Sequence, residues 1–281
     1  MPPFKAGALG PLRFGLTGEV VVVTGGGSGI GRATAELATA DGALVAVLDI
    51  DKAGIAGTIE GISAAGGTAR GYPVDVRDAE GLEATCARVE DELGAIYGLV
   101  PFAGTSRPEP AELMPLTTWT GLIDLNLTGM FLTCQSAGRR MLAHGRGAIV
   151  TIGSVDSLAG HAARSHYCAS KFAVANLTRA LALEWGRRGV RVNCLAPGIV
   201  DTPLIRRGIP IDQLENVLLD RTPHPRYADA LDMAKVALFL LSDAASYVNG
   251  AILSADGGLS AGYLNHTFSG VRRAVSTAGQ Q

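Results

Sequence analysis

Near the N-terminus, a glycine-rich turn joins a β-branched run to a helical stretch, an order of elements that few folds accommodate. The run Glu19–Val23 is followed by the turn Thr24–Gly31, and residues 32–40 are typical of a helix. Glycine adopts positive φ and lets a phosphate approach the backbone, while a helix N-terminus offers free N–H groups and a positive dipole end. Flexible loops are also rich in glycine, but the strand and helix here favour a dinucleotide site. The predicted contacts are Gly25, Gly27, Ser28, Gly29, Ile30 and Gly31.

An acidic residue ends the second predicted strand. Asp49 lies 18 residues beyond Gly31, close to the spacing at which a carboxylate binds the adenosine ribose hydroxyls. Such a carboxylate repels the 2′-phosphate of NADP, and Ser28 stands where a basic residue could serve that phosphate. We therefore expect NAD as the cofactor rather than NADP. The alternative roles are local: Asp49 could cap the next helix, which Lys52 could open.

Strands and helices alternate along the chain. This alternation predicts an α/β fold, a doubly wound, Rossmann-like parallel sheet with helices on both faces. The predicted strands are 19–24, 43–49, 68–74, 97–102, 147–153, 190–195 and 250–254. The predicted helices are 29–41, 51–65, 78–94, 116–143, 165–188 and 228–242.

A tyrosine and a lysine lie four residues apart in the predicted helix 165–188. Positions i and i+4 share one face of a helix, so the Lys171 ammonium would lie beside the Tyr167 phenol. A nearby positive charge lowers the pKa of a phenol and makes it a general acid/base. Ser154 ends an apolar strand, where residues face the ligand crevice of a parallel sheet. The same Tyr-Lys spacing also occurs on helices where the Tyr packs and the Lys extends to solvent.

Together, these motifs resemble those of the short-chain dehydrogenase/reductase family, in its shorter single-domain branch. The resemblance runs from about residue 16 to about residue 259. The matching positions, in order, are Thr24–Gly31, Asp49, Asp75-Val76, Asn126, Ser154, Tyr167 with Lys171, Pro197-Gly198 and Thr202.

The resemblance implies a role for each of these residues. Tyr167 would transfer the proton, Lys171 would bind the nicotinamide ribose and lower the tyrosine pKa, and Ser154 would orient the substrate oxygen. Asn126 would shape its helix so that a water joins a proton relay, although alone it could be an ordinary polar residue of a helix interior. The further cofactor contacts implied are Asp75, Val76, Ala103, Gly104, Pro197, Gly198, Val200 and Thr202.

One segment departs from the family pattern. After the fourth strand the family usually has Asn-Asn-Ala-Gly, whereas this chain has Pro101-Phe-Ala-Gly104. Both amide side chains that tie the sheet beside the cofactor are lost, and Pro101 removes a backbone donor. Phe102 would fill the space with apolar volume, and the catalytic groups are unaffected.

Composition excludes several classes of function. A net charge of −2 without a basic patch gives no case for nucleic acid or an acidic membrane. No stretch approaches eighteen apolar residues and residues 1–15 lack the apolar region of a secretory signal, which predicts a cytoplasmic protein without a membrane span. The four cysteines (Cys86, Cys134, Cys168 and Cys194) lack metal spacing, and each is expected to be buried. No metal site is predicted; His161 or His166 could line a substrate pocket.

A single domain with two extensions is expected. Residues 1–15 form a flexible tail, 16–260 the dehydrogenase domain, and 261–281 an extension. The proline-containing segment 201–227 is predicted to be a substrate lid. Its apolar positions Leu204, Ile205, Ile209 and Leu214 suggest an apolar or cyclic substrate, or else ordinary helix packing. The resemblance also implies a homotetramer, paired through helices within 122–143 and 172–183.

The sequence thus predicts an NAD-dependent oxidoreductase that interconverts a small secondary alcohol and a ketone by hydride transfer. A 3-oxoacyl-thioester (acyl carrier protein) reductase is the alternative within the enzyme class, against which Asp49 argues, since many such enzymes use NADPH. A nucleotide-binding regulator without catalysis is the alternative from another class. The intact Ser154, Tyr167 and Lys171 argue against it.

Overall fold

The computed structural model describes residues 14–208, 221–224 and 226–262. Its centre is a seven-stranded sheet in the order β3-β2-β1-β4-β5-β6-β7, and every neighbouring pair is parallel. The strands are β1 (Val20–Thr24), β2 (Leu44–Asp49), β3 (Thr68–Pro73), β4 (Ile96–Pro101), β5 (Gly147–Ile152), β6 (Val190–Pro197) and β7 (Ile252–Ala255). The predicted doubly wound parallel sheet is confirmed.

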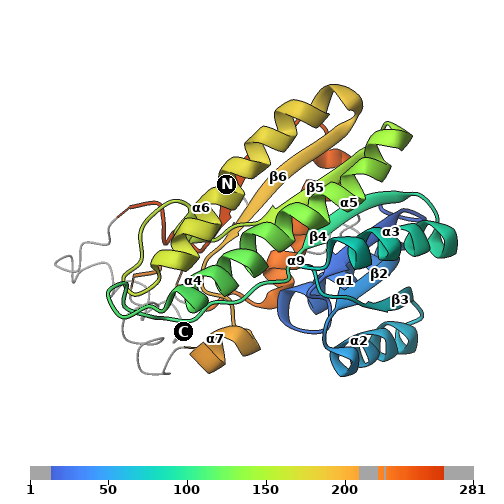
Figure 1. Ribbon diagram of the computed structural model, residues 1–281. Helices are drawn as coiled ribbons and strands as arrows, with labels where there is room; N and C mark the ends of the chain where they lie inside the picture. The colour runs from blue at the N-terminus through green and yellow to red at the C-terminus, as the bar shows by residue number, and fades with distance from the viewer. Residues whose placement is uncertain (1–13, 209–220, 225, 263–281) are drawn as a thin grey trace, which may run out of the picture.

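Helices cover both faces of this sheet (Figure 1). Helices α3, α5 and α6 pack together on one face, and α1 packs against α2 and α9 on the other. Their bounds are α1 (Gly29–Ala40), α2 (Lys52–Ala64), α3 (Ala79–Leu93), α5 (Gly129–His144), α6 (Ser165–Trp185) and α9 (Ala230–Leu241), with the shorter α4 (Leu116–Ile123) and α7 (Pro203–Gly208).

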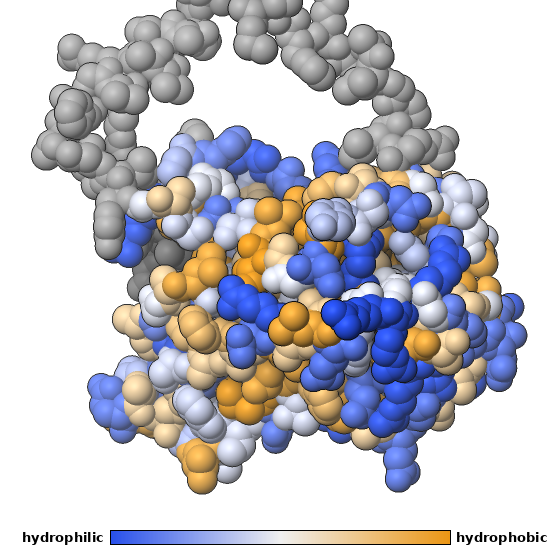
Figure 2. All heavy atoms as spheres, turned by 90° about the horizontal axis from the view of Figure 1, so that it is seen from above, coloured by the Kyte–Doolittle hydropathy of each residue, from blue (hydrophilic) through white to orange (hydrophobic). Residues whose placement is uncertain are grey.

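The core lies between the sheet and its two helical layers. All residues of β1, β4 and β5 are buried, because each of these strands is covered on both faces. Burying one such valine or isoleucine side chain contributes about 1.5–3 kcal/mol. The edge strand β3 differs, since only Tyr72 of it is buried. Apolar side chains also reach the surface, where Figure 2 shows them in patches between hydrophilic ones.

The strand order reverses direction between β1 and β4. From β1 the chain moves outward to β2 and β3, and then returns to β4 on the other side of β1. In such sheets a crevice opens beyond the carboxyl ends of the two strands, where the connecting loops diverge. The glycine-rich turn follows β1 and the segment Phe102–Gly104 follows β4, so both lie at this crevice.

The predicted helix 116–143 is interrupted. Helix α4 ends at Ile123, a single π-turn, η1 (Asp124–Thr128), follows, and α5 begins at Gly129. Asn126 lies in the π-turn, and its buried side chain bonds the backbone of Thr105. A π-turn inserts an extra residue into a helix and is frequent at functional sites. Sequence periodicity alone does not reveal the π-turn, because residues 116–143 as a whole still have a pattern typical of one continuous helix.

The close approach of Gly31 to the glycine-rich turn generates a prediction about stability. A Cβ on Gly31 would overlap the carbonyl oxygen of Gly25, whereas Gly121 of helix α4 has open space around it. We expect Gly31→Ala to lower the free energy of unfolding by about 1–3 kcal/mol, the usual cost of overpacking. Gly121→Ala should leave it unchanged or raise it by about 0.5–1 kcal/mol. Urea unfolding of both variants checks this, and equal stability of the two would contradict it.

Candidate functional site

A crevice of about 500 Å³ lies at the carboxyl ends of β1, β4 and β5. Every residue predicted from the sequence to contact the cofactor lines it. These are Gly25, Gly27, Ser28, Gly29, Ile30, Gly31, Asp49, Asp75, Val76, Ala103, Gly104, Tyr167, Lys171, Pro197, Gly198, Val200 and Thr202. Ser154 lines it too, whereas the side chain of Asn126 lies behind it. Segments separated by more than 170 residues thus meet at one cavity.

The glycine-rich turn forms a cradle that side chains would fill. Gly25 has a φ of +66°, and a Cβ there would lie 2.7 Å from the backbone nitrogen of Ala103. A Cβ on Gly27 would lie 3.0 Å from Oδ2 of Asp49. Helix α1 begins beside this turn, and its N-cap Ser28 makes no side-chain capping bond. The uncapped N–H groups and the exposed backbone fit a pyrophosphate.

Asp49 occupies the far end of the crevice. Its Oδ2 accepts a hydrogen bond from Gly27 N at 3.0 Å, and its Oδ1 accepts one from Asp51 N at 3.0 Å. Helix α2 is capped by Asp51 instead, whose Oδ1 accepts from Ala53 N. The alternative role of Asp49 as the helix cap is therefore wrong. The carboxylate is half-buried beside the glycine cradle, the position that a ribose-binding acid requires.

A short network fixes Ser154 at the end of β5. Ser154 caps a 3₁₀ turn, η2 (Val155–Ser157), where its Oγ accepts a hydrogen bond from Asp156 N at 3.1 Å. Ser157 Oγ accepts one from Ser154 N and donates to the Lys171 carbonyl oxygen at 2.8 Å. Strand β5 is thereby joined to helix α6, and the Ser154 hydroxyl faces the crevice next to Tyr167.

Lys171 and Tyr167 lie on one face of α6, as the i,i+4 spacing predicts. Lys171 Nζ donates to the Ile152 carbonyl oxygen at 2.8 Å and lies 5.7 Å from the centre of the Tyr167 ring. Burial lowers the pKa of the Lys171 ammonium to about 8. The buried cation is tolerated because it has this backbone partner.

The expectation that a neighbouring cation lowers the Tyr167 pKa is not met in the protein alone. Burial raises the pKa of the Tyr167 phenol to about 12, and a hydrogen bond with Ser154 opposes that rise. Desolvation of the phenolate by the surrounding protein outweighs the nearby positive charge of Arg164. Tyr167 lines the crevice and is half-buried.

Asn126 connects the π-turn to the loop after β4. Its Oδ1 accepts from Thr105 N at 2.9 Å and its Nδ2 donates to the Thr105 carbonyl oxygen at 2.8 Å. The β4–β5 ladder ends at Leu99, two residues before Pro101, which has no N–H to donate. Phe102 packs on the hydrophobic core, as expected.

Several crevice residues were not predicted. Ile50, just after β2, is 68% exposed and lines the crevice. The sequence signal that could have identified it is an apolar residue directly after a predicted strand. Arg77 forms a 2.6 Å ion pair with Asp75, and its hydrogen bonds hold the pKa of the Asp75 carboxyl below its usual value. Other unpredicted members are Asp51, Val74, Phe102, Thr105, Leu125, Ile152, Gly153 and Pro203.

A second cavity, of about 830 Å³, adjoins the crevice. Four residues line both: Ser154, Tyr167, Gly198 and Ile205. The rest of its wall combines apolar side chains with charged ones. The apolar members are Val155, Ala159, Ala162, Ile199 and Leu259, and the polar or charged ones are Asp156, His161, Arg164, Arg221 and Ser260.

The predicted histidines and cysteines differ in burial and in whether they line a cavity. His161 lines the second cavity, whereas His166 is fully buried outside both cavities. Cys86, Cys134 and Cys194 are buried, as expected. The same prediction for Cys168 is wrong, because it lies on a side of α6 that is partly exposed.

The predicted lid is described only in part. Residues 203–208 form helix α7, in which Leu204 and Ile205 line the crevice. Ile209 and Leu214 lie outside the described residues, as do residues 1–13 and 263–281 of the predicted extensions. Within the described ranges, no group of three or more His, Cys, Asp or Glu could hold a metal ion. No described helix is long and apolar enough to cross a membrane.

Comparison with known families decides the identity of the chain. A family model described as enoyl-(acyl carrier protein) reductase, within the short-chain dehydrogenase/reductase family, matches residues 24–260. The chain is a short-chain dehydrogenase/reductase.

Relatives of this short-chain dehydrogenase/reductase act on alcohols. D-threitol dehydrogenase of Mycolicibacterium smegmatis is 40% identical over 248 residues, which cover 87% of this chain and 94% of that one. Cis-4-hydroxycyclohexanecarboxylate dehydrogenase of Sinomonas cyclohexanicum is 40% identical over 86% of this chain and 97% of its own. A gluconate 5-dehydrogenase from Burkholderia cenocepacia J2315, solved with NADP and tartrate, has a TM-score of 0.85 and 33% identity, over 89% of this chain and 98% of that one.

The activity of this short-chain dehydrogenase/reductase follows from the family and the site together. It is an oxidoreductase that interconverts a secondary alcohol and a ketone, and it acts on the CH–OH group of a small molecule with a nicotinamide cofactor.

Proposed function

We propose that this enzyme oxidises a small secondary alcohol with NAD, using Tyr167 as the acid/base and Ser154 as the group that orients the reacting oxygen. The observation that carries this proposal is that Ser154 and Tyr167 line both the cofactor crevice and the second cavity. A substrate in the second cavity and a nicotinamide in the crevice would meet at these two side chains. When bound, the cofactor supplies the hydride acceptor or donor.

The proton transfer is assigned to residues of α6 and β5. Ser154 Oγ donates a hydrogen bond to the substrate oxygen, and Tyr167 takes the hydroxyl proton during oxidation or returns it during reduction. Lys171 keeps a positive charge near the phenol and so favours the phenolate. We assign Asn126 to positioning, because its side chain holds Thr105 and the π-turn that face this site.

The remaining crevice residues are proposed to hold the cofactor. The glycine cradle and the N-terminus of α1 would bind the pyrophosphate. Asp49 would bind the adenosine ribose, Asp75 and Val76 would lie at the adenine, and Thr202 would meet the nicotinamide amide.

NAD is favoured over NADP by the charge at the ribose end. The Asp49 carboxylate lies beside the glycine cradle, where a 2′-phosphate would meet like charge. Arg77 lines the same end, but its guanidinium is engaged by Asp75. The related gluconate 5-dehydrogenase was solved with NADP, so the preference needs a direct measurement.

The substrate is proposed to have a compact, partly apolar carbon skeleton, open-chain or cyclic. Six apolar side chains of the described residues line the second cavity. Two relatives act on a tetritol and a cyclohexane derivative, as their names state. The 3-oxoacyl-thioester reductase is the weaker alternative, because these relatives are alcohol dehydrogenases.

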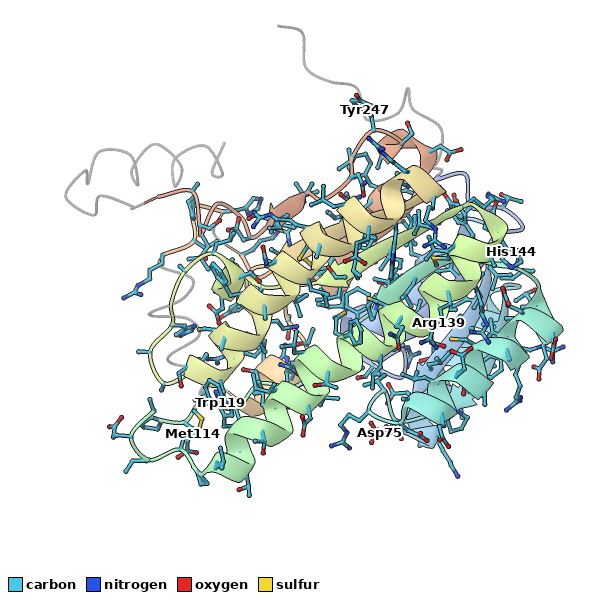
Figure 3. The ribbon with its side chains drawn as sticks, turned by 45° about the horizontal axis from the view of Figure 1, so that its top comes forward. Asp75, Met114, Trp119, Arg139, His144 and Tyr247 are labelled. Carbon is cyan, nitrogen blue, oxygen red and sulfur yellow. The ribbon has the colours of Figure 1, made fainter. Side chains whose placement is uncertain are left out.

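A homotetramer in the cytoplasm is the proposed state of the enzyme. Phe172 on α6 is 62% exposed and Leu183 is 84% exposed, while Tyr247, after α9, points away from the body (Figure 3). Two separate apolar faces suit the two-fold contacts of a tetramer. The four free thiols suit a reducing compartment. Light scattering should give four times the mass of one chain, and a monomer would exclude this assembly.

The rate of alcohol oxidation should rise with pH, because the base is the phenolate of Tyr167, which forms as the pH approaches the phenol pKa.

Loss of the phenol tests the role of Tyr167. Tyr167→Phe should lower kcat by at least about 10²-fold, the usual contribution of a general acid/base, while the Kd for the cofactor stays the same. The control is Tyr247→Phe, an exposed tyrosine far from the crevice. Unchanged turnover in Tyr167→Phe would remove the assignment.

Removal of the carboxylate tests the role of Asp49. Asp49→Ala should shift the ratio of the Kd values for NADH and NADPH toward NADPH by about tenfold, corresponding to about 1.4 kcal/mol of lost repulsion and ribose binding. Fluorescence titration measures both constants. Asp78→Ala is the control, because Asp78 caps α3 and does not line the crevice. A wild-type ratio in Asp49→Ala would disprove this role.

A further inference from the structure

A buried arginine forms part of the wall of the second cavity. Arg164 immediately precedes α6 and is only 8% exposed. Its backbone is tied down at both ends of the turn: Arg164 N donates to the His161 carbonyl oxygen, and Cys168 N donates to the Arg164 carbonyl oxygen. The side chain is therefore held at the cavity by a rigid backbone.

Among the described residues, the charge of Arg164 has no counter-ion. Nη1 donates to Ser106 Oγ at 2.8 Å, a neutral partner, and among the described residues no carboxylate oxygen lies within 4.0 Å of the guanidinium. Arg140, whose side chain is 14% exposed, shows the contrast, because it pairs with both Glu83 and Glu90. A buried cation without an anion is costly, so proteins seldom keep one that does not meet a ligand.

Other charges at the cavity do not cancel it. Asp156 lies on the same wall, but its Oδ1 is 3.4 Å from Nδ1 of His161. Arg221 contributes a second guanidinium to the cavity. The described residues of the wall thus contribute two arginines and one carboxylate, which is paired with a histidine. Their net positive charge favours an anionic ligand.

Arg164 is close to the proposed acid/base. Its Cζ lies 5.9 Å from the centre of the Tyr167 ring. One small molecule can therefore place a carbinol at the phenol and an anionic group at the guanidinium, with its carbon skeleton against the apolar wall. The planar fork of arginine matches the two oxygens of a carboxylate.

We infer that Arg164 binds a carboxylate of the substrate, and that the enzyme converts small hydroxy acids to oxo acids. This inference rests on the proposed function of the same site. During oxidation the carbinol carbon gives a hydride to the nicotinamide and the hydroxyl proton passes to Tyr167, so that the C–OH becomes C=O. The carboxylate is unchanged and serves as the anchor. Among the relatives, one acts on a cyclohexanecarboxylate and one was solved with tartrate, according to their names.

The test compares an acid with its neutral amide. The substrates are cis-4-hydroxycyclohexanecarboxylate and the corresponding primary carboxamide, assayed with NAD. The wild-type kcat/KM should favour the acid by at least about tenfold, since a hydrogen bond to a charged group contributes about 1.5–3 kcal/mol. Arg164→Gln should lower kcat/KM for the acid by about 10- to 100-fold, mainly through KM, and leave the amide within about twofold.

Arg164→Lys separates geometry from charge, because lysine keeps the positive charge without the fork. It should recover part of the preference for the acid. Arg139→Gln is the matched control, since Arg139 is an exposed arginine on α5 (Figure 3) and lines neither cavity. Its acid-to-amide ratio should equal that of the wild type.

A binding experiment keeps the inference independent of turnover. Calorimetry with cyclohexanecarboxylate, which has no carbinol, and with cyclohexanecarboxamide is run on the NAD-bound protein. Binding of the acid alone, lost in Arg164→Gln, supports the anchor. Equal binding of acid and amide, no binding of the acid, or an equal loss of activity on both substrates in Arg164→Gln would overturn it; the last result would mean that Arg164 only supports Tyr167. Absence of turnover together with acid-specific binding would instead contradict the proposed oxidation and leave the anchor intact.

Discussion

The hydrogen bonds between helix α6 and the end of strand β5 are the interaction on which the site depends. Lys171 Nζ binds the Ile152 carbonyl oxygen, and the Lys171 carbonyl oxygen accepts from Ser157. Ser157 also holds the backbone of Ser154. Side chain and main chain of Lys171 thus link helix and strand, which brings Tyr167 and Ser154 together. These hydrogen bonds are buried, so breaking one would leave an unpaired polar group at a cost of about 1–3 kcal/mol.

Charge is distributed unevenly along the two connected cavities. At one end, helix α1, whose N-cap makes no side-chain capping bond, and Asp49 present a positive dipole and a carboxylate to the crevice. At the other end Arg164 presents a buried cation to the substrate. Between them, burial lowers the pKa of the Lys171 ammonium and raises the pKa of the Tyr167 phenol. Each arrangement costs folding free energy, and each lies where a ligand would compensate for it.

Local departures from the family pattern are compensated through tertiary contacts. Pro101 ends β4 after the ladder to β5 has stopped, so its missing N–H leaves no broken bond in that ladder. Asn126 reaches across from the π-turn and bonds the loop at Thr105. The cavity wall is therefore held by an amide side chain that comes from a helix rather than from the strand end. Phe102 adds apolar contact with the core at the same place.

The sequence by itself determined the order of elements and, through the family resemblance, the predicted contacts that line the crevice. These residues meet because the carboxyl ends of parallel strands lie at one edge of the sheet, so motifs that follow β1, β2, β4, β5 and β6 converge. Contacts between residues far apart in the chain have no such local signal. Three features depend on which surfaces pack together, and only the tertiary structure decided them. They are the π-turn at Asn126, the partly exposed side of Cys168 and, within the part of the chain that the structure describes, the lack of a counter-ion for Arg164. The same holds for the Tyr167 pKa, since sequence spacing shows the neighbouring lysine while the desolvation that outweighs it comes from packing.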